Sequence, residues 1–193
     1  MHARELLLPV VAPIVGVLAL GALVLGGPWS PLALDSANAR YAGGDLEGAI
    51  SRYEAVAQSW QTPSTRAEAW RRAGMIRRGQ GDVRGAVRDY EHAAEIEPVA
   101  ERRSAILTEL GLLYKDELHD PRSCAEAFEH AALDSRAGEG DLAAAGCWLQ
   151  AGETDLAREA LTRAAARPNL QETAEKALAS LEATPASAAD VEP

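Results

Sequence analysis

The sequence predicts an all-α protein built from repeated helix–turn–helix units, and two observations indicate this fold class. The segment GDLEGAISRYEAVA (44–57) returns 37 residues later as GDVRGAVRDYEHAA (81–94), with seven of fourteen positions identical. Such a period indicates units too small to bury their apolar faces alone, which therefore stack on one another. About a fifth of the 193 residues are alanine, the best helix former, and only 5% are aromatic.

The first segment, residues 1–29, is predicted to be a transmembrane anchor. No charged residue occurs from Leu6 to Leu34, and the apolar run 6–27 is as long as the roughly 20 residues that cross a bilayer. The alternative is a cleaved secretory signal, which has a shorter apolar region followed closely by a small-x-small site. Here the Ala-x-Ala sequence at 37–39 lies well beyond the apolar run. We therefore expect a retained, single-pass anchor.

The charges beside this segment predict its orientation. Arg4 and the α-amino group precede it, partly offset by Glu5, and the first charge after it is Asp35. Positive charge favours the cytoplasmic side, so we expect a protein of the inner membrane whose C-terminal domain faces the periplasm. About five residues join the apolar run to the first repeat, so the domain should lie close to the membrane.

The second repeat, residues 67–100, shows the helix–turn–helix pattern most clearly. Small and apolar residues recur at helical spacing on both sides of the break Gly79-Gln80-Gly81-Asp82. Glycine allows the left-handed turn there, Asp82 is placed to cap the following helix, and Pro98 ends the unit. The pattern therefore predicts two helices joined by a tight turn.

This unit resembles a tetratricopeptide repeat, a 34-residue helix–turn–helix, at Trp70, Gly74, Gly81, Asp82, Ala86, Tyr90, Ala93 and Pro98. Arg77 departs from the family pattern, which places an aromatic residue there. Weaker copies flank it: the first keeps Gly44, Asp45, Ala49 and Tyr53; the third Gly111, Asp120, Pro121 and Phe128; the fourth Trp148, Gly152, Ala157, Leu161 and Pro168. The resemblance implies an α-solenoid of about four repeats over residues 30–168.

The C-terminal region is predicted to close this array. Residues 169–183 place Leu170, Ala174, Leu178 and Leu181 on one helical face with charges opposite, which is typical of a capping helix. Residues 184–193 have no apolar pattern, so we expect a disordered tail.

The resemblance also implies a concave groove, lined by the first helix of each unit, that holds a peptide or helix of another protein. Matching the repeats residue by residue places Glu68, Arg71, Met75 and Arg78 of the second unit and Thr108, Leu112 and Lys115 of the third in this groove. The outer units would contribute Leu34, Asn38, Tyr41, Leu142 and Leu149, with the register there open by one residue.

The arginine cluster Arg71, Arg72, Arg77 and Arg78 has two interpretations. Its guanidinium groups could pair with carboxylates of a partner, or they could form a solvated face with local pairs such as Glu68 with Arg72. The carboxylate clamp of some relatives uses Lys and Asn in the groove, and Arg71 and Met75 do not supply it.

The remaining chemistry-bearing residues point to no catalytic, cofactor or metal site. Cys124 and Cys147 are expected to be buried thiols, although a disulfide could form if their Cα atoms come within about 7 Å. The histidines His92 and His130 occupy equivalent repeat positions and lack metal-ligand spacing. No phosphate-binding loop or nucleophile motif is present. We therefore expect a protein that is not an enzyme.

Charge completes the functional expectation. The formal net charge of −10 gives no overall positive field to attract nucleic acid, so we expect protein or peptide partners instead. The sequence as a whole predicts a membrane-anchored scaffold or adaptor, attached through residues 6–27. The alternative is a structural subunit of a larger membrane complex that packs through its anchor helix.

Overall fold

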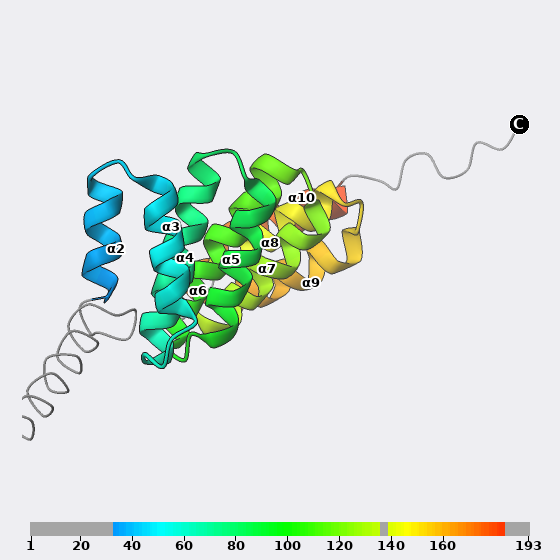
Figure 1. Cartoon of the computed structure of the whole chain (residues 1–193). Helices are drawn as coiled ribbons and strands as arrows, with labels where there is room; N and C mark the ends of the chain where they lie inside the picture. The colour runs from blue at the N-terminus through cyan, green and yellow to red at the C-terminus, as the bar shows by residue number, and fades with distance from the viewer. Residues whose placement is uncertain (1–32, 136–138, 184–193) are drawn as a thin grey trace, which may run out of the picture.

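The computed structural model describes residues 33–135 and 139–183, and every regular element in these ranges is a helix. Eight helices form four antiparallel pairs that stack in chain order, and a final helix follows (Figure 1). The pairs are α2 (Ala33–Ala42) with α3 (Leu46–Ala57), α4 (Pro63–Gly79) with α5 (Val83–Ile96), α6 (Ala100–Leu113) with α7 (Pro121–Asp134), and α8 (Glu139–Gln150) with α9 (Thr154–Ala165); the final helix is α10 (Gln171–Ala183). We call each pair a unit. The predicted all-α, helix–turn–helix organisation is confirmed.

The turns within the units form as the local sequence predicts. Gly81 has a φ of +82°, which an L side chain rarely adopts, and Asp82 then caps α5 by accepting a hydrogen bond of 2.9 Å from the Gly85 N–H. In the third unit, Asp120 caps α7 in the same way, accepting from the Ser123 N–H at 3.1 Å, and Pro121 begins the helix. The caps expected at Asp82 and Asp120 are therefore present.

Buried alanines, together with a large side chain from the second helix of each unit, form much of the core. Tyr53, Tyr90, Phe128 and Leu161 are all buried. Around them the helices approach closely: a Cβ added at Gly74 would lie 3.1 Å from the Asp89 Cβ and 3.2 Å from the Ala86 carbonyl oxygen. Small residues at the helix crossing thus allow the two helices to pack closely, because larger side chains would not fit between them.

The expectation for the cysteines is wrong: Cys124 of α7 and Cys147 of α8 form a disulfide. Both residues are buried, as expected, but their Cα atoms are 6.0 Å apart, within the distance that a disulfide spans. The reason is the packing of α8 against α7, which brings two small core positions of neighbouring units opposite each other. The bond links the third unit to the fourth.

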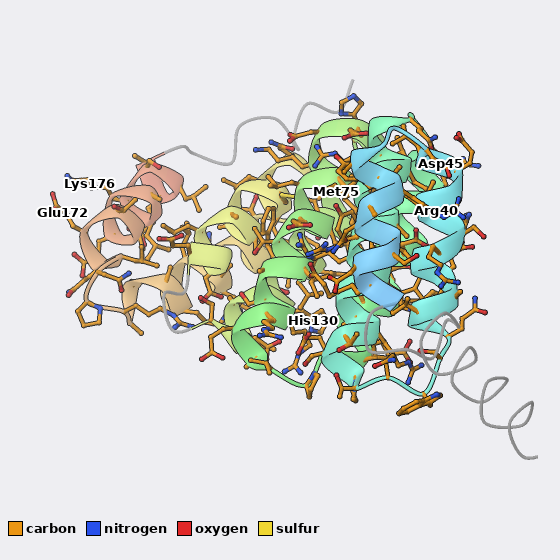
Figure 2. All side chains as sticks on the ribbon, turned by 60° about the vertical axis from the view of Figure 1, so that its left-hand side comes forward. Arg40, Asp45, Met75, His130, Glu172 and Lys176 are labelled. Carbon is orange, nitrogen blue, oxygen red and sulfur yellow. A yellow bond between two sulfur atoms is a disulfide. The ribbon has the colours of Figure 1, made fainter. Side chains whose placement is uncertain are left out.

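At the C-terminal end of the array, α10 packs Ala177, Leu178 and Leu181 against the last core cluster. Its outer face carries exposed charges such as the Lys176–Glu172 ion pair of 2.6 Å, labelled in Figure 2. This arrangement agrees with a capping helix. Among the described helices, none combines the length and apolarity needed to cross a bilayer. The anchor predicted within residues 1–29 and the tail predicted at 184–193 lie outside the described residues.

Candidate functional site

The candidate site is the face formed by the first helices of the units, α2, α4, α6 and α8. Each of these helices leaves one large apolar side chain exposed on its surface, with 37% to 44% of the residue accessible: Tyr41, Met75, Leu112 and Leu149. These residues all belong to the set that the repeat pattern assigns to the groove. Large apolar side chains are therefore available to a partner along the whole array.

A π-helical turn keeps the third unit in register with the second. In three units the residue that follows the turn donates its backbone N–H to the carbonyl five residues earlier; these donors are Asp45, Asp82 and Glu153. In the third unit the donor is Asp120, and its acceptor, the Tyr114 carbonyl, lies six residues earlier. The extra residue lies in the π-helical turn Tyr114–Leu118 that extends α6. Leu112 and Lys115 therefore take the places that Met75 and Arg78 hold in α4.

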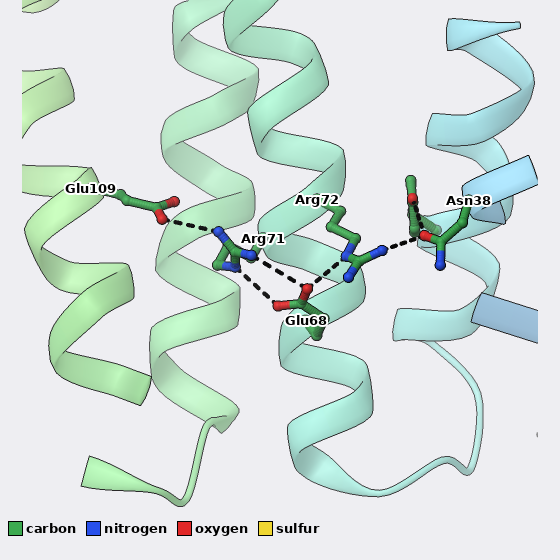
Figure 3. A network of polar contacts seen from close by, with 6 residues as sticks. Asn38, Glu68, Arg71, Arg72 and Glu109 are labelled. Carbon is green, nitrogen blue, oxygen red and sulfur yellow. Dashed lines mark hydrogen bonds and ion pairs between the residues drawn. The ribbon is translucent and has the colours of Figure 1, made fainter. Parts of the chain in front are cut away.

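A polar network crosses this face over the first three units (Figure 3). Glu68 of α4 accepts hydrogen bonds from Arg72 Nε at 2.6 Å and from Arg71 Nε at 3.0 Å. Arg71 continues to Glu109 of α6 through a contact of 2.9 Å, and Arg72 continues to Asn38 of α2. Asn38 also accepts a hydrogen bond of 2.5 Å from the buried Tyr53 hydroxyl. We call Asn38, Glu68, Arg71, Arg72 and Glu109 the polar ladder.

The hydrogen bonds of the polar ladder stabilise the ionised forms of its side chains. Burial alone would disfavour the Glu68 carboxylate, but hydrogen bonds from Arg71 and Arg72 outweigh it and lower the pKa of Glu68. The hydrogen bond to Glu68 in turn raises the pKa of Arg71. Arg78 is engaged as well, donating to Glu117 at 2.6 Å. A partner carboxylate would therefore have to displace Glu68, Glu109 or Glu117 to reach these arginines.

Arg77 does not belong to this face, so grouping it with the other arginines is wrong. Its side chain is only 19% exposed and pairs with Glu54 of α3 and with Asp89 of α5, which is itself buried. Burial raises the pKa of Asp89, opposed by the hydrogen bond from Arg77. An ion pair between three helices thus fills the place where tetratricopeptide repeats carry an aromatic side chain.

Two hollows open between successive first helices. The α4–α6 hollow, of about 530 Å³, is lined largely by charged groups, including Glu68, Arg71 and Glu109 of the ladder. The α6–α8 hollow, of about 510 Å³, has fewer charged residues in its lining. Its lining consists of Ser104, Thr108, Leu112, Lys115, Phe128, Ala131, Ser135, Glu139, Gly140, Leu142, Ala143, Gly146, Cys147 and Gln150.

The α6–α8 hollow brings predicted groove residues of two units together. Thr108, Leu112 and Lys115 face Leu142 of the fourth unit across it. Sequence reasoning missed Gly146, which stands six residues before Gly152 just as Met75 stands six before Gly81. A Cβ added at Gly146 would meet nothing within 4 Å, so the absence of a side chain leaves this part of the hollow open.

The charged groups of the candidate site differ in how they are paired. Lys115 forms no ion pair within the part of the chain that the structure describes, in contrast to Arg71 and Arg78. Across residues 33–135 and 139–183, no three histidine, cysteine or acidic side chains come close enough together to hold a metal ion. The hollow thus offers apolar side chains, an open glycine and a lysine, Lys115, that forms no ion pair with the described residues.

Comparison with known proteins supports the fold and goes no further. No protein-family model matches the sequence, and a search of curated proteins finds no significant match. Among solved structures, the chain is similar to the crystal structure of MamA, with a TM-score of 0.54 and 17% identity over 83% of this chain and 89% of that one. This similarity, together with the stacked helix pairs, shows a tetratricopeptide-like helical fold.

Proposed function

We propose that this chain is a non-catalytic scaffold, anchored in the membrane, that binds a segment of another protein along its first-helix face. The observation that carries the proposal is the α6–α8 hollow, where Thr108, Leu112 and Lys115 meet Leu142 and Gly146 of the next unit. Its volume of about 510 Å³ is sufficient to bury side chains of a bound segment. The exposed leucine on its rim and the apolar interior favour an apolar anchor residue on the partner.

The charged part of the face contributes orientation rather than an anchor. In the polar ladder, Arg71 is satisfied by Glu68 and Glu109, so a partner gains little by replacing one carboxylate with another. Lys115 at the α6–α8 hollow lacks such a partner among the described residues. We therefore place the main contact at the third and fourth units, with an acidic group of the partner beside Lys115.

The proposed location is the inner membrane, with the repeat domain in the periplasm. The uncharged run Leu6 to Leu34 and the positive charge before it support the anchor and its orientation. The Cys124–Cys147 disulfide adds independent support, because disulfides persist in oxidising compartments such as the periplasm.

The test fills the hollow without disturbing the fold. Gly146→Leu places a side chain where a Cβ meets no neighbour, and it replaces glycine within a helix, so stability should not fall. Gly79→Leu is the matched control, because Gly79 also has open space and lies at the end of α4, away from the hollow. Proteins that co-purify with the full chain from gently solubilised membranes are identified by mass spectrometry.

We expect Gly146→Leu to weaken capture of the partner by about 2 kcal/mol, roughly thirtyfold in affinity, while Gly79→Leu captures it like the wild type. Equal capture by both variants would contradict binding at this hollow. The structural-subunit alternative makes a different prediction: the partner is retained by Gly146→Leu but lost when residues 1–29 are replaced by an unrelated transmembrane segment.

A further inference from the structure

The loop between α3 and α4 exposes a tryptophan within an uncharged stretch. Trp60 is 71% exposed, whereas Trp148 is buried in the core and Trp70 is half-buried. The eleven residues 55–65 carry no charge, and Glu54 and Arg66 flank them. Beside the indole, a gap of about 290 Å³ is lined by Ala55, Gln58 and Ser59, so the ring does not pack closely onto α3.

The loop around Trp60 is nevertheless well held. The Ser59 hydroxyl donates to the Val56 carbonyl at 2.7 Å, and Thr62 caps α4 by accepting from the Thr65 N–H at 3.3 Å. Arg66 Nε donates to the Ala57 carbonyl at 2.8 Å and so fixes the end of α3. The polar groups are thus used within the loop, and the indole is the part left facing outward.

Trp60 lies at the end of the domain where the described chain begins. Because α2 and α3 are antiparallel and joined by a short turn, α2 starts beside the end of α3, and Trp60 follows that end by three residues. Figure 1 shows the start of α2 and the α3–α4 loop on the same side of the first unit. Asp45, labelled in Figure 2, marks the opposite end of this helix pair.

The length of the chain places this end near the bilayer. The predicted span ends at residue 27 and α2 begins at Ala33, so five residues connect them. Even a fully extended connection of this length reaches only about 20 Å. With the anchor in the bilayer, the start of α2 therefore lies within that distance of the membrane surface, on the side of the first unit that also carries Trp60.

We propose that the 55–65 loop is a membrane-contact site in which the Trp60 indole inserts into the lipid–water interface. Tryptophan is favoured there because its ring is largely apolar while its N–H can still bond to headgroups or water, and an uncharged loop loses little solvation on contact. This inference rests on the anchor in the proposed function. Its consequence is a repeat domain that is attached to the bilayer at a second point and held in a defined orientation.

The test uses the full chain in vesicles of phosphatidylethanolamine and phosphatidylglycerol, with or without bromine on the acyl chains as a fluorescence quencher. Trp29→Phe removes the tryptophan beside the predicted span, and the half-buried Trp70 and the buried Trp148 remain in every sample. We expect brominated lipid to lower the emission of Trp29→Phe. This loss should disappear in Trp29→Phe/Trp60→Phe, which differs only at the proposed contact.

An alkaline carbonate wash of the same vesicles separates the two proposals. Protein that resists the wash but shows no quenching assigned to Trp60 would overturn the contact and leave the anchor standing. Protein that the wash removes would overturn the anchor, and the membrane contact with it. Trp60 emission that is unquenched by lipid but shifts with protein density would assign the loop to a second copy of the chain, which also overturns the membrane contact.

Discussion

At the scale of single residues, Arg77 has the most consequential environment. Its guanidinium group forms an ion pair with the buried Asp89 and a second ion pair with Glu54 of the preceding unit. Removing the arginine leaves a buried carboxylate without compensation, which costs more than the ion pair itself contributes. The ion pair therefore constrains the choice of residue at three helices at once.

We predict that Arg77→Ala lowers the free energy of unfolding by about 3 kcal/mol, measured by chemical denaturation. Arg40→Ala is the control, because Arg40 and Asp45 form an ion pair that is about half exposed and should contribute less than about 1 kcal/mol. Adding Asp89→Asn to Arg77→Ala should restore part of the loss by removing the stranded charge. Equal effects of Arg77→Ala and Arg40→Ala would contradict this account.

The residue scale also shows what sequence could and could not predict. The caps at Asp82 and Asp120 were predictable because their hydrogen bonds join residues only three apart. The ion pairs of Arg77 could not be predicted, because its partners Asp89 and Glu54 lie 12 and 23 residues away on other helices. Its departure from the family pattern was visible, but the compensating Asp89 could be recognised only once α4 and α5 were packed.

At the scale of helices, stability depends on how closely α4 and α5 approach. Gly74 faces Asp89 Cβ and the Ala86 carbonyl at distances that leave no room for a longer side chain. We predict that Gly74→Leu overpacks this crossing and lowers stability by about 1–3 kcal/mol, measured by thermal unfolding. Gly79→Leu in the same helix should not, because its Cβ has open space. An unchanged melting temperature for Gly74→Leu would show that the two helices can separate at little cost.

The helices and their order followed from the repeat pattern, because glycine turns and capping residues recur at nearly fixed spacing. The π-helical turn Tyr114–Leu118 could not be predicted from this pattern, since an added residue can also be accommodated by a longer loop. Four of the fourteen residues that line the α6–α8 hollow came from the pattern: Thr108, Leu112, Lys115 and Leu142. Gly146 was not predicted, because the search for groove residues looked for side chains that could line the groove, and glycine has none.

At the scale of the whole molecule, the disulfide connects the fold to its surroundings. It joins α7 to α8 across a sequence separation of 23 residues, so it restricts the unfolded chain over the third and fourth units. These are the units that form the α6–α8 hollow, and Cys147 is part of its lining. The sequence could not decide between thiols and a disulfide, because the choice depends on a Cα separation set by helix packing.

We predict that both cysteines of the membrane-extracted protein resist alkylation until a reductant is added. Replacing both by alanine should lower the free energy of unfolding by about 3 kcal/mol, as expected for a loop of this length. The alkylation is read by mass spectrometry and the stability by chemical denaturation. Free thiols in protein isolated under alkylating conditions would argue against an oxidising location for the repeat domain.

The π-helical turn has a consequence for how such an array can change in evolution. A chain built from stacked copies is sensitive to insertions, because one added residue inside a helix rotates everything beyond it by about 100°. Here the insertion is confined to the π-helical turn that follows α6, and α8 still presents Leu142 and Gly146 toward the same hollow as Leu112. A lineage can therefore lengthen one copy without rotating the copies that follow, and a binding surface shared by neighbouring copies survives the change.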